Sequence, residues 1–122
     1  AALAKEPDNI ISLNNLAWAM SEAGEAGALE HAERAYRLAP NSAEVANTYG
    51  WILVKRGDTA RGIEMLRKSV ALAPADGSKR VLLARGLIKA GDKAAAKTEL
   101  EAVVNAGSPT SKLEAEQMLK DL

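Results

Sequence analysis

The chain has 122 residues, of which 48% are hydrophobic and 26% are charged, with 16 basic and 16 acidic residues in balance. Its length suits one compact unit, and the balanced charge argues against attraction to nucleic acid or to an anionic membrane surface. The absence of cysteine excludes disulfides and thiolate metal sites, and no apolar run is long enough for direct membrane insertion, so we expect a soluble cytoplasmic or periplasmic protein.

Helix-forming residues dominate the composition: Ala, Leu, Lys and Glu are frequent and Phe is absent. At the N-terminus, residues 1–8 are expected to be the tail of a helix from a preceding repeat. Pro7 would end that helix, because the residue before a proline is pushed out of the helical conformation. The natural protein is therefore expected to continue upstream of residue 1.

Three similar blocks follow along the chain, at residues 16–20, 49–53 and 83–87. Each block precedes a turn that contains a glycine, and a second helical stretch follows each turn, at about 28–38, 62–72 and 94–104. Pro7, Pro40 and Pro74 lie 33 and 34 residues apart. This spacing predicts three helix–turn–helix repeats with boundaries at about 9–42, 43–76 and 77–107.

Local signals place the helix ends and the closest contacts. Asn9, Asn41 or Ser42, and Asp76 are side chains suited to cap the following helices. Small residues recur where the two helices of a pair must approach closely: Ala17, Gly50 and Ala84 on the first helix, and Ala28, Gly62 and Ala96 on the second. A glycine inside a helix costs about 1 kcal/mol relative to alanine, so Gly50 and Gly62 predict a close helix–helix contact.

Residues 108–122 are predicted to form one further helix, which begins with Ser108 as cap and Pro109 at the first helical position. Its apolar residues form a stripe on one face: Ala115, Met118, Leu119 and Leu122. A stack of helix pairs needs its open end covered, so a C-terminal capping helix is favoured over the first helix of a truncated fourth repeat.

The repeat pattern resembles the tetratricopeptide repeat (TPR) family over about residues 9–107. The resemblance rests on the spacing, the small residues at positions 8 and 20 of each repeat, the glycine turn and the proline at position 32. It implies an all-α fold: a right-handed α-solenoid of antiparallel helix pairs with three repeats plus the C-terminal capping helix. The blocks around Trp18 and Trp51 also resemble bacterial TPR proteins of exopolysaccharide secretion and envelope sorting systems.

In TPR proteins the first helices of successive pairs line a concave groove, so the resemblance implies a peptide-binding site there. The expected groove residues are Asn14, Trp18, Asn47, Trp51, Val54, Lys55, Val81, Arg85 and Lys89. An asparagine amide both donates and accepts hydrogen bonds, and tryptophan is a typical interface anchor. Alternatively, the tryptophans fill the inner curve of the stack and pack on neighbouring first helices, and the asparagines form hydrogen bonds between adjacent helices. Arg85 and Lys89 would then lie on a solvated helix face, with their charges neutralised through surface pairs that involve Glu22, Glu44 and Lys55.

These features predict a protein–protein interaction module, part of a larger bacterial TPR scaffold protein, whose partner is a protein or peptide. Two alternatives stay open: self-assembly into a homo-oligomer through the stack ends or the convex face, and a regulatory appendage to a separate catalytic domain. Neither catalysis nor a metal or cofactor is expected, because His31 is the only histidine and there is no glycine-rich phosphate loop. Nucleic-acid binding is not expected either, since the chain lacks a basic stripe.

Overall fold

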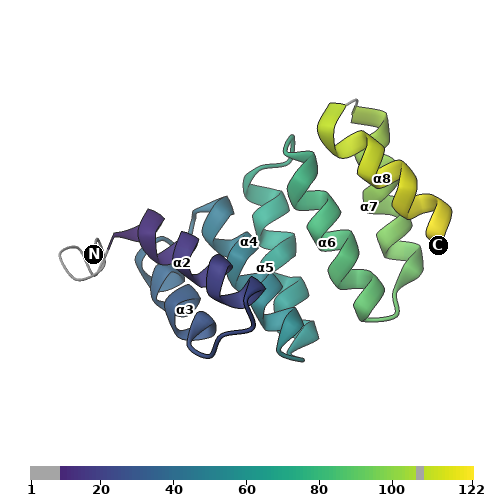
Figure 1. Ribbon diagram of the computed structural model, residues 1–122. Coiled ribbons are helices and arrows are strands. Elements are labelled where there is room, and N and C mark those ends of the chain that lie inside the picture. The colour runs from purple at the N-terminus through teal and green to yellow at the C-terminus, as the bar shows by residue number, and fades with distance from the viewer. Residues whose placement is uncertain (1–8, 107–108) are drawn as a thin grey trace.

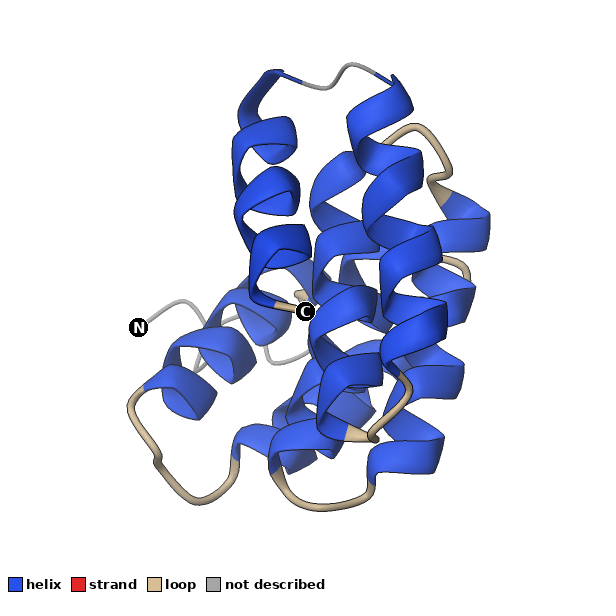
Figure 2. Cartoon of the chain, turned by 90° about the vertical axis from the view of Figure 1, so that its right-hand side faces the viewer, coloured by secondary structure: helices blue, strands red, loops and turns tan. Residues whose placement is uncertain are grey.

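The chain folds into helices joined by short loops, and the computed structural model describes residues 9–106 and 109–122, without the side chain of Pro109. These residues contain no strand (Figure 2). The helices are α2 (Ile10–Glu22), α3 (Ala28–Leu38), α4 (Ala43–Lys55), α5 (Thr59–Leu72), α6 (Gly77–Lys89), α7 (Lys93–Ala106) and α8 (Pro109–Asp121). The predicted helical tail at 1–8 and the Ser108 cap lie outside the described residues.

Consecutive helices form antiparallel pairs, and the pairs stack. Helix α2 packs on α3, α4 on α5, and α6 on α7, and Figure 1 shows the three pairs following one another from purple to green. Each first helix also contacts the first helix of the next pair. Helix α8 packs on α7 and α6, as α6 packs on α5 and α4. The predicted all-α solenoid of helix pairs is confirmed, and α8 lies where the first helix of a next pair would lie.

The turns inside the three pairs share one geometry. Gly24, Gly57 and Gly91 all have positive φ, which only glycine adopts at little cost. The N–H of Gly57 donates to the carbonyl of Val54 at 3.1 Å, and the N–H of Asp58 donates to that of Leu53 at 2.9 Å. The same pair of bonds closes α2 and α6, so in each first helix two of the last carbonyls have a donor from the turn.

The predicted caps are confirmed at the start of all three first helices. The side chains of Asn9, Ser42 and Asp76 accept hydrogen bonds from backbone N–H groups in the first turn of α2, α4 and α6, at 2.9, 3.3 and 3.0 Å. A cap of this kind stabilises a helix by about 1 kcal/mol. The caps and the glycine turns together fix the length of the three helices that carry the candidate site.

The closest helix contact lies between α4 and α5, where the sequence predicts it. A Cβ atom added to Gly50 would lie 2.8 Å from the carbonyl oxygen of Gly62 and 2.9 Å from the backbone nitrogen of Leu66. A Cβ added to Gly62 would lie 2.7 Å from the oxygen of Gly50. The two backbones therefore touch, and no side chain fits between them.

Helix α8 closes the core at its end of the stack. Ala115 is fully buried, and Met118 and Leu119 pack against the same cluster of apolar residues from α4 to α7. The prediction is wrong for Leu122, which is 36% exposed, because α8 ends at Asp121 and the last residue lies beyond the helical stripe. Three of the four predicted residues of the stripe thus cover the core.

A buried ammonium joins the second pair to the third. The side chain of Lys79, at the start of α6, is 4% exposed, and its Nζ contacts Glu44 of α4 at 2.5 Å and Asp76 at 2.8 Å. Both carboxylates reach solvent, with 69% and 39% of their side chains exposed. Lys79 therefore links the first helices α4 and α6 through an ion pair. A repeat pattern based on apolar residues does not predict this contact.

Candidate protein-binding groove

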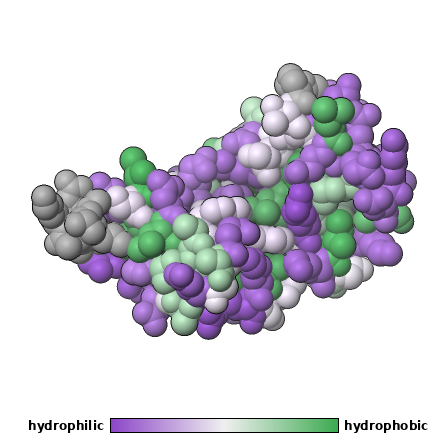
Figure 3. All heavy atoms as spheres, in the orientation of Figure 1, coloured by the Kyte–Doolittle hydropathy of each residue, from purple (hydrophilic) through white to green (hydrophobic). Residues whose placement is uncertain are grey.

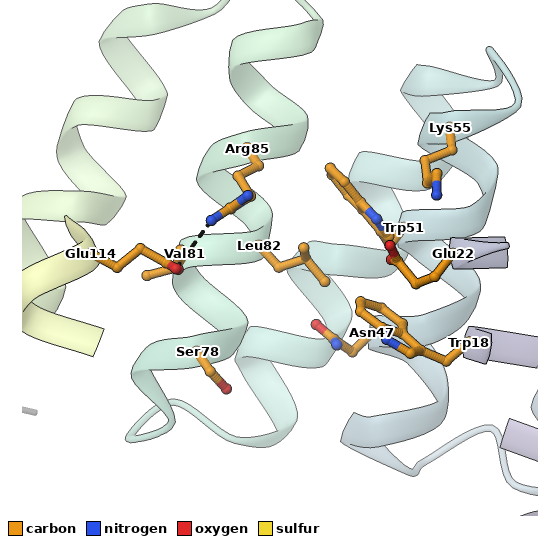
Figure 4. Close-up of a pocket in the computed structure, with 10 residues that line it drawn as sticks. All are labelled: Trp18, Glu22, Asn47, Trp51, Lys55, Ser78, Val81, Leu82, Arg85 and Glu114. Carbon is orange, nitrogen blue, oxygen red and sulfur yellow. Dashed lines mark ion pairs between the residues drawn. The ribbon is translucent and has the colours of Figure 1, made fainter. Parts of the chain in front are cut away.

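A groove runs along the first helices of the pairs and consists of two adjoining pockets. The larger pocket has a volume of about 430 Å³ and is lined by Trp18, Glu22, Asn47, Trp51, Lys55, Ser78, Val81, Leu82, Arg85 and Glu114 (Figure 4). The smaller has a volume of about 250 Å³ and is lined by Asn14, Asn15, Trp18, Glu44, Asn47 and Thr48. Because Trp18 and Asn47 belong to both, we treat the two pockets as one site, the first-helix groove.

Most of the residues predicted for the groove come together in it. Those that line one or both pockets are Asn14, Trp18, Asn47, Trp51, Lys55, Val81 and Arg85. They recur four residues apart on α2, α4 and α6, and residues at this spacing share one face of a helix. The helical period and the stacking of the pairs therefore build the groove together.

Two residues predicted for the groove lie elsewhere. Val54 is only 4% exposed and faces α5, where its backbone and side chain pack directly against Gly62. It belongs to the core, because the α4 face next to the glycine contact is turned away from the groove. Lys89 is exposed on α6 and lines neither pocket. The structure thus corrects both placements.

Both tryptophans lie between the two environments expected for them. Trp18 and Trp51 are half-buried and line the larger pocket, while Trp51 also packs against the apolar core of α4 to α8. Leu82 of α6, which the sequence pattern did not single out, lines the pocket beside them. The groove therefore combines fixed aromatic surface with access from solvent, the combination found at interface anchors.

The two asparagines carry unsatisfied acceptors. The Oδ1 atoms of Asn14 and Asn47 are buried, and no donor among the described residues bonds to either oxygen. The alternative in which these oxygens bridge neighbouring helices is therefore not observed. A buried polar atom without a partner costs about 1–3 kcal/mol, and a ligand N–H would remove this penalty if the amide turned its oxygen toward the groove.

The charges around the groove have partners that the repeat pattern does not predict. Arg85 forms an ion pair with Glu114 of α8 at 3.1 Å (Figure 4). Glu44, which was a candidate to neutralise Arg85, contacts Lys79 instead. The Nζ of Lys55 donates to the carbonyl oxygen of Ser21 at 3.0 Å. Glu114 lies outside the three predicted repeats, so their pattern does not predict this ion pair.

Other chemistry in the described part of the chain is sparse. No group of three or more His, Asp and Glu side chains gathers there in a way that would hold a metal ion. His31 lies on α3, half-buried among charged neighbours and away from the groove. None of the described helices has both the length and the apolar character needed to cross a membrane.

No protein-family model matches this sequence, and no curated protein matches it significantly. Solved structures do match. Two structures of SycD, the type III secretion translocator chaperone of Yersinia enterocolitica, align with TM-scores of 0.81 and 0.80 at 16% and 15% identity. They cover 99% and 93% of this chain and 96% and 91% of theirs. MamA aligns with a TM-score of 0.74 at 19% identity, over 97% of this chain and 78% of its own. At such identities the likeness shows the fold alone: a TPR-like solenoid of helix pairs.

Proposed function

We propose that the chain binds an extended segment of another protein in the first-helix groove. The observation that carries this proposal is the repetition of one arrangement on neighbouring helices: Asn14 with Trp18 on α2, and Asn47 with Trp51 on α4. In both, a buried amide oxygen without a donor stands one helical turn from a half-exposed indole. The amides suit the backbone of a bound segment, and the indoles suit its side chains.

The likeness in fold to SycD supports the proposal in a general way. That protein is a chaperone of translocators, so its partners are other proteins. A stack of helix pairs offers an extended groove without a deep cavity. Such a groove suits an extended segment of another protein better than a compact small molecule. The mixed polar and aromatic lining of the first-helix groove agrees with this kind of ligand.

The test begins with a phage-displayed library of random dodecapeptides selected against the wild-type chain. For a selected peptide, Trp51→Ala is expected to weaken binding by about 2 kcal/mol, roughly thirtyfold in Kd, because a half-buried indole is a typical interface anchor. Fluorescence polarisation of the labelled peptide measures the change. Arg37→Ala, an exposed position on α3, serves as the matched control and should leave Kd unchanged.

Asn47→Ala separates function from folding. Removing a buried oxygen that has no donor should leave the free energy of unfolding unchanged or raise it by about 1 kcal/mol, while binding of the selected peptide weakens. Urea unfolding and polarisation on the same variant measure both quantities. Loss of stability together with unchanged binding would mean that Asn47 serves the fold and not a ligand.

Self-association is a second candidate, supported by two exposed apolar side chains. Ile11 of α2 is 73% exposed and Leu113 of α8 is 75% exposed, on the first and last described helices. The face seen in Figure 3 is mostly hydrophilic, with apolar residues in separate small patches. Sedimentation equilibrium tests this candidate: it requires a mass that rises with concentration and a lower mass in Leu113→Ser. A monomer mass that stays constant with concentration would reject self-association.

A further inference from the structure

The charged side chains of the larger pocket differ in whether they have a partner. Arg85 is paired with Glu114, and the Lys55 ammonium donates to the carbonyl of Ser21 at the end of α2. Glu22 is exposed, and among the described residues no cation forms an ion pair with it. The cations of the pocket thus already contact oxygen atoms, whereas the carboxylate of Glu22 is available to a ligand.

Two indoles line the same pocket as this available carboxylate. Glu22 follows Trp18 by four residues on α2, so both side chains share the face that looks toward α4 and Trp51. Figure 4 shows the Glu22 side chain reaching toward the space between the two indoles, with Leu82 of α6 across the pocket. Indole faces attract cations more strongly than other aromatic rings do, and a nearby carboxylate adds to that attraction.

We propose that the first-helix groove selects a protein segment with a basic side chain, and that this side chain enters between Trp18 and Trp51 with its charge against Glu22. The methylene stem of a lysine or arginine would pack on the indoles and on Leu82, as long basic side chains do on apolar surfaces. Glu22 is then the specificity-determining residue of the groove. This inference rests on the proposed function, because only a bound segment can deliver the basic group.

Charge complementarity favours a basic segment over an acidic one. Glu114 already neutralises Arg85 and would repel an acidic side chain brought to the same cation. An acidic side chain at Lys55 would share the ammonium with the carbonyl of Ser21. A basic side chain at Glu22 displaces no ion pair among the described residues. The net gain is therefore larger for the basic segment, because repulsion from Glu114 would offset part of the attraction of an acidic one.

The experiment uses the random dodecapeptide library and the whole chain. Peptides selected on the wild type should be enriched in Lys or Arg at one position. A synthetic selected peptide and its analogue, in which norleucine replaces that basic residue, are then measured against wild type, Glu22→Gln, Lys55→Gln and the control Glu101→Gln. Glu22→Gln should weaken the basic peptide about fivefold and leave the norleucine analogue unchanged, since only a charge is lost. Glu101→Gln removes the same charge from an exposed glutamate on α7 that lines neither pocket, so this matched control should leave the binding of both peptides unchanged.

Several outcomes would overturn the inference, and they differ from a failure of the proposed function. Selected peptides without basic enrichment, or an equal effect of Glu22→Gln on both peptides, would reject the role of Glu22 while Trp51→Ala still reported groove binding. Enrichment in acidic residues, with weaker binding in Lys55→Gln, would assign the groove to acidic segments. If no selected peptide depended on Trp51, the proposed function would fall and this inference with it.

Discussion

Gly50→Ala is expected to lower the free energy of unfolding by about 3 kcal/mol, even though alanine favours a helix over glycine by about 1 kcal/mol. The new methyl group would lie 2.8 Å from the carbonyl oxygen of Gly62 and 2.9 Å from the backbone nitrogen of Leu66. Backbone atoms cannot rotate aside as side chains do, so α4 and α5 must separate. Urea unfolding followed by circular dichroism measures the loss.

Gly86→Ala on α6 is the matched control for this prediction. There the added methyl group would meet only side chains, the nearest being Leu66 Cδ1 at 3.0 Å and Val54 Cγ2 at 3.6 Å. These groups can shift, and the gain in helix propensity offsets part of the strain, so the stability should stay within about 1 kcal/mol of wild type. Equal stability of Gly50→Ala and wild type would contradict the backbone contact between α4 and α5.

The second large effect concerns the buried Lys79. Replacing both of its partners, by Glu44→Gln with Asp76→Asn, is expected to cost about 2 kcal/mol, because it leaves a buried ammonium without a counter-charge. The cost of breaking a fully buried pair is larger, but solvent reaches both carboxylates here. Asparagine caps a helix as well as aspartate does, so the start of α6 is preserved. Urea unfolding at neutral pH gives the value.

Lys79→Met is the complementary variant and is expected to cost less than about 1 kcal/mol. Methionine fills a similar volume, and the carboxylates of Glu44 and Asp76 stay solvated after the ammonium is removed. We therefore expect Lys79→Met to lose less stability than the double variant Glu44→Gln with Asp76→Asn. A Lys79→Met variant less stable than the double variant would show that the ion pairs stabilise the fold more than the burial of the charge costs it.

The same cluster makes the stability depend on pH. Hydrogen bonds from Lys79 and Ser78 lower the pKa of Asp76 below its ordinary value of 3.8. Burial by itself would lower the pKa of Lys79, but the hydrogen bonds and charges of Asp76 and Glu44 outweigh burial and raise it above 10.5. The contribution of Asp76 to the free energy of unfolding is thus present above pH 3.8, and it is lost as the pH falls through the pKa of Asp76 in the folded state. The contribution of Lys79 to the free energy of unfolding is present below pH 10.5, and it is lost as the pH rises through the pKa of Lys79 in the folded state. The double variant should lose less stability on acidification than wild type.

The fold was predictable because its signals are local and repeated. Asn9, Ser42 and Asp76 cap the first helices, and the glycine at each turn ends them, where the sequence places these events. Gly50 and Gly62 marked the closest contact because glycine is otherwise unfavourable inside a helix. Each of these features depends on a few neighbouring residues or on the repeat itself. The agreement of three copies was therefore sufficient to predict the helices and their pairing.

The candidate site was predictable only as far as the repeat extends. Positions four apart on the first helices brought the asparagines and tryptophans to one groove, but Val54 turned toward α5 because the glycine contact draws that face into the core. The partner of Arg85 comes from α8, which lies outside the three predicted repeats. The burial of Lys79 depends on side chains from two pairs at once. Such contacts arise from tertiary packing, and a periodic pattern carries no information about them.

The most direct test of the account is the emission of each tryptophan when a selected peptide is added. Trp18→Phe and Trp51→Phe leave one indole each, and both remaining indoles are half-exposed in the free chain. A segment bound in the first-helix groove should shift both emissions to the blue and protect both from acrylamide, because it removes water from the indoles. A peptide that binds with high affinity while both emissions and both quenching constants stay unchanged would contradict binding in this groove.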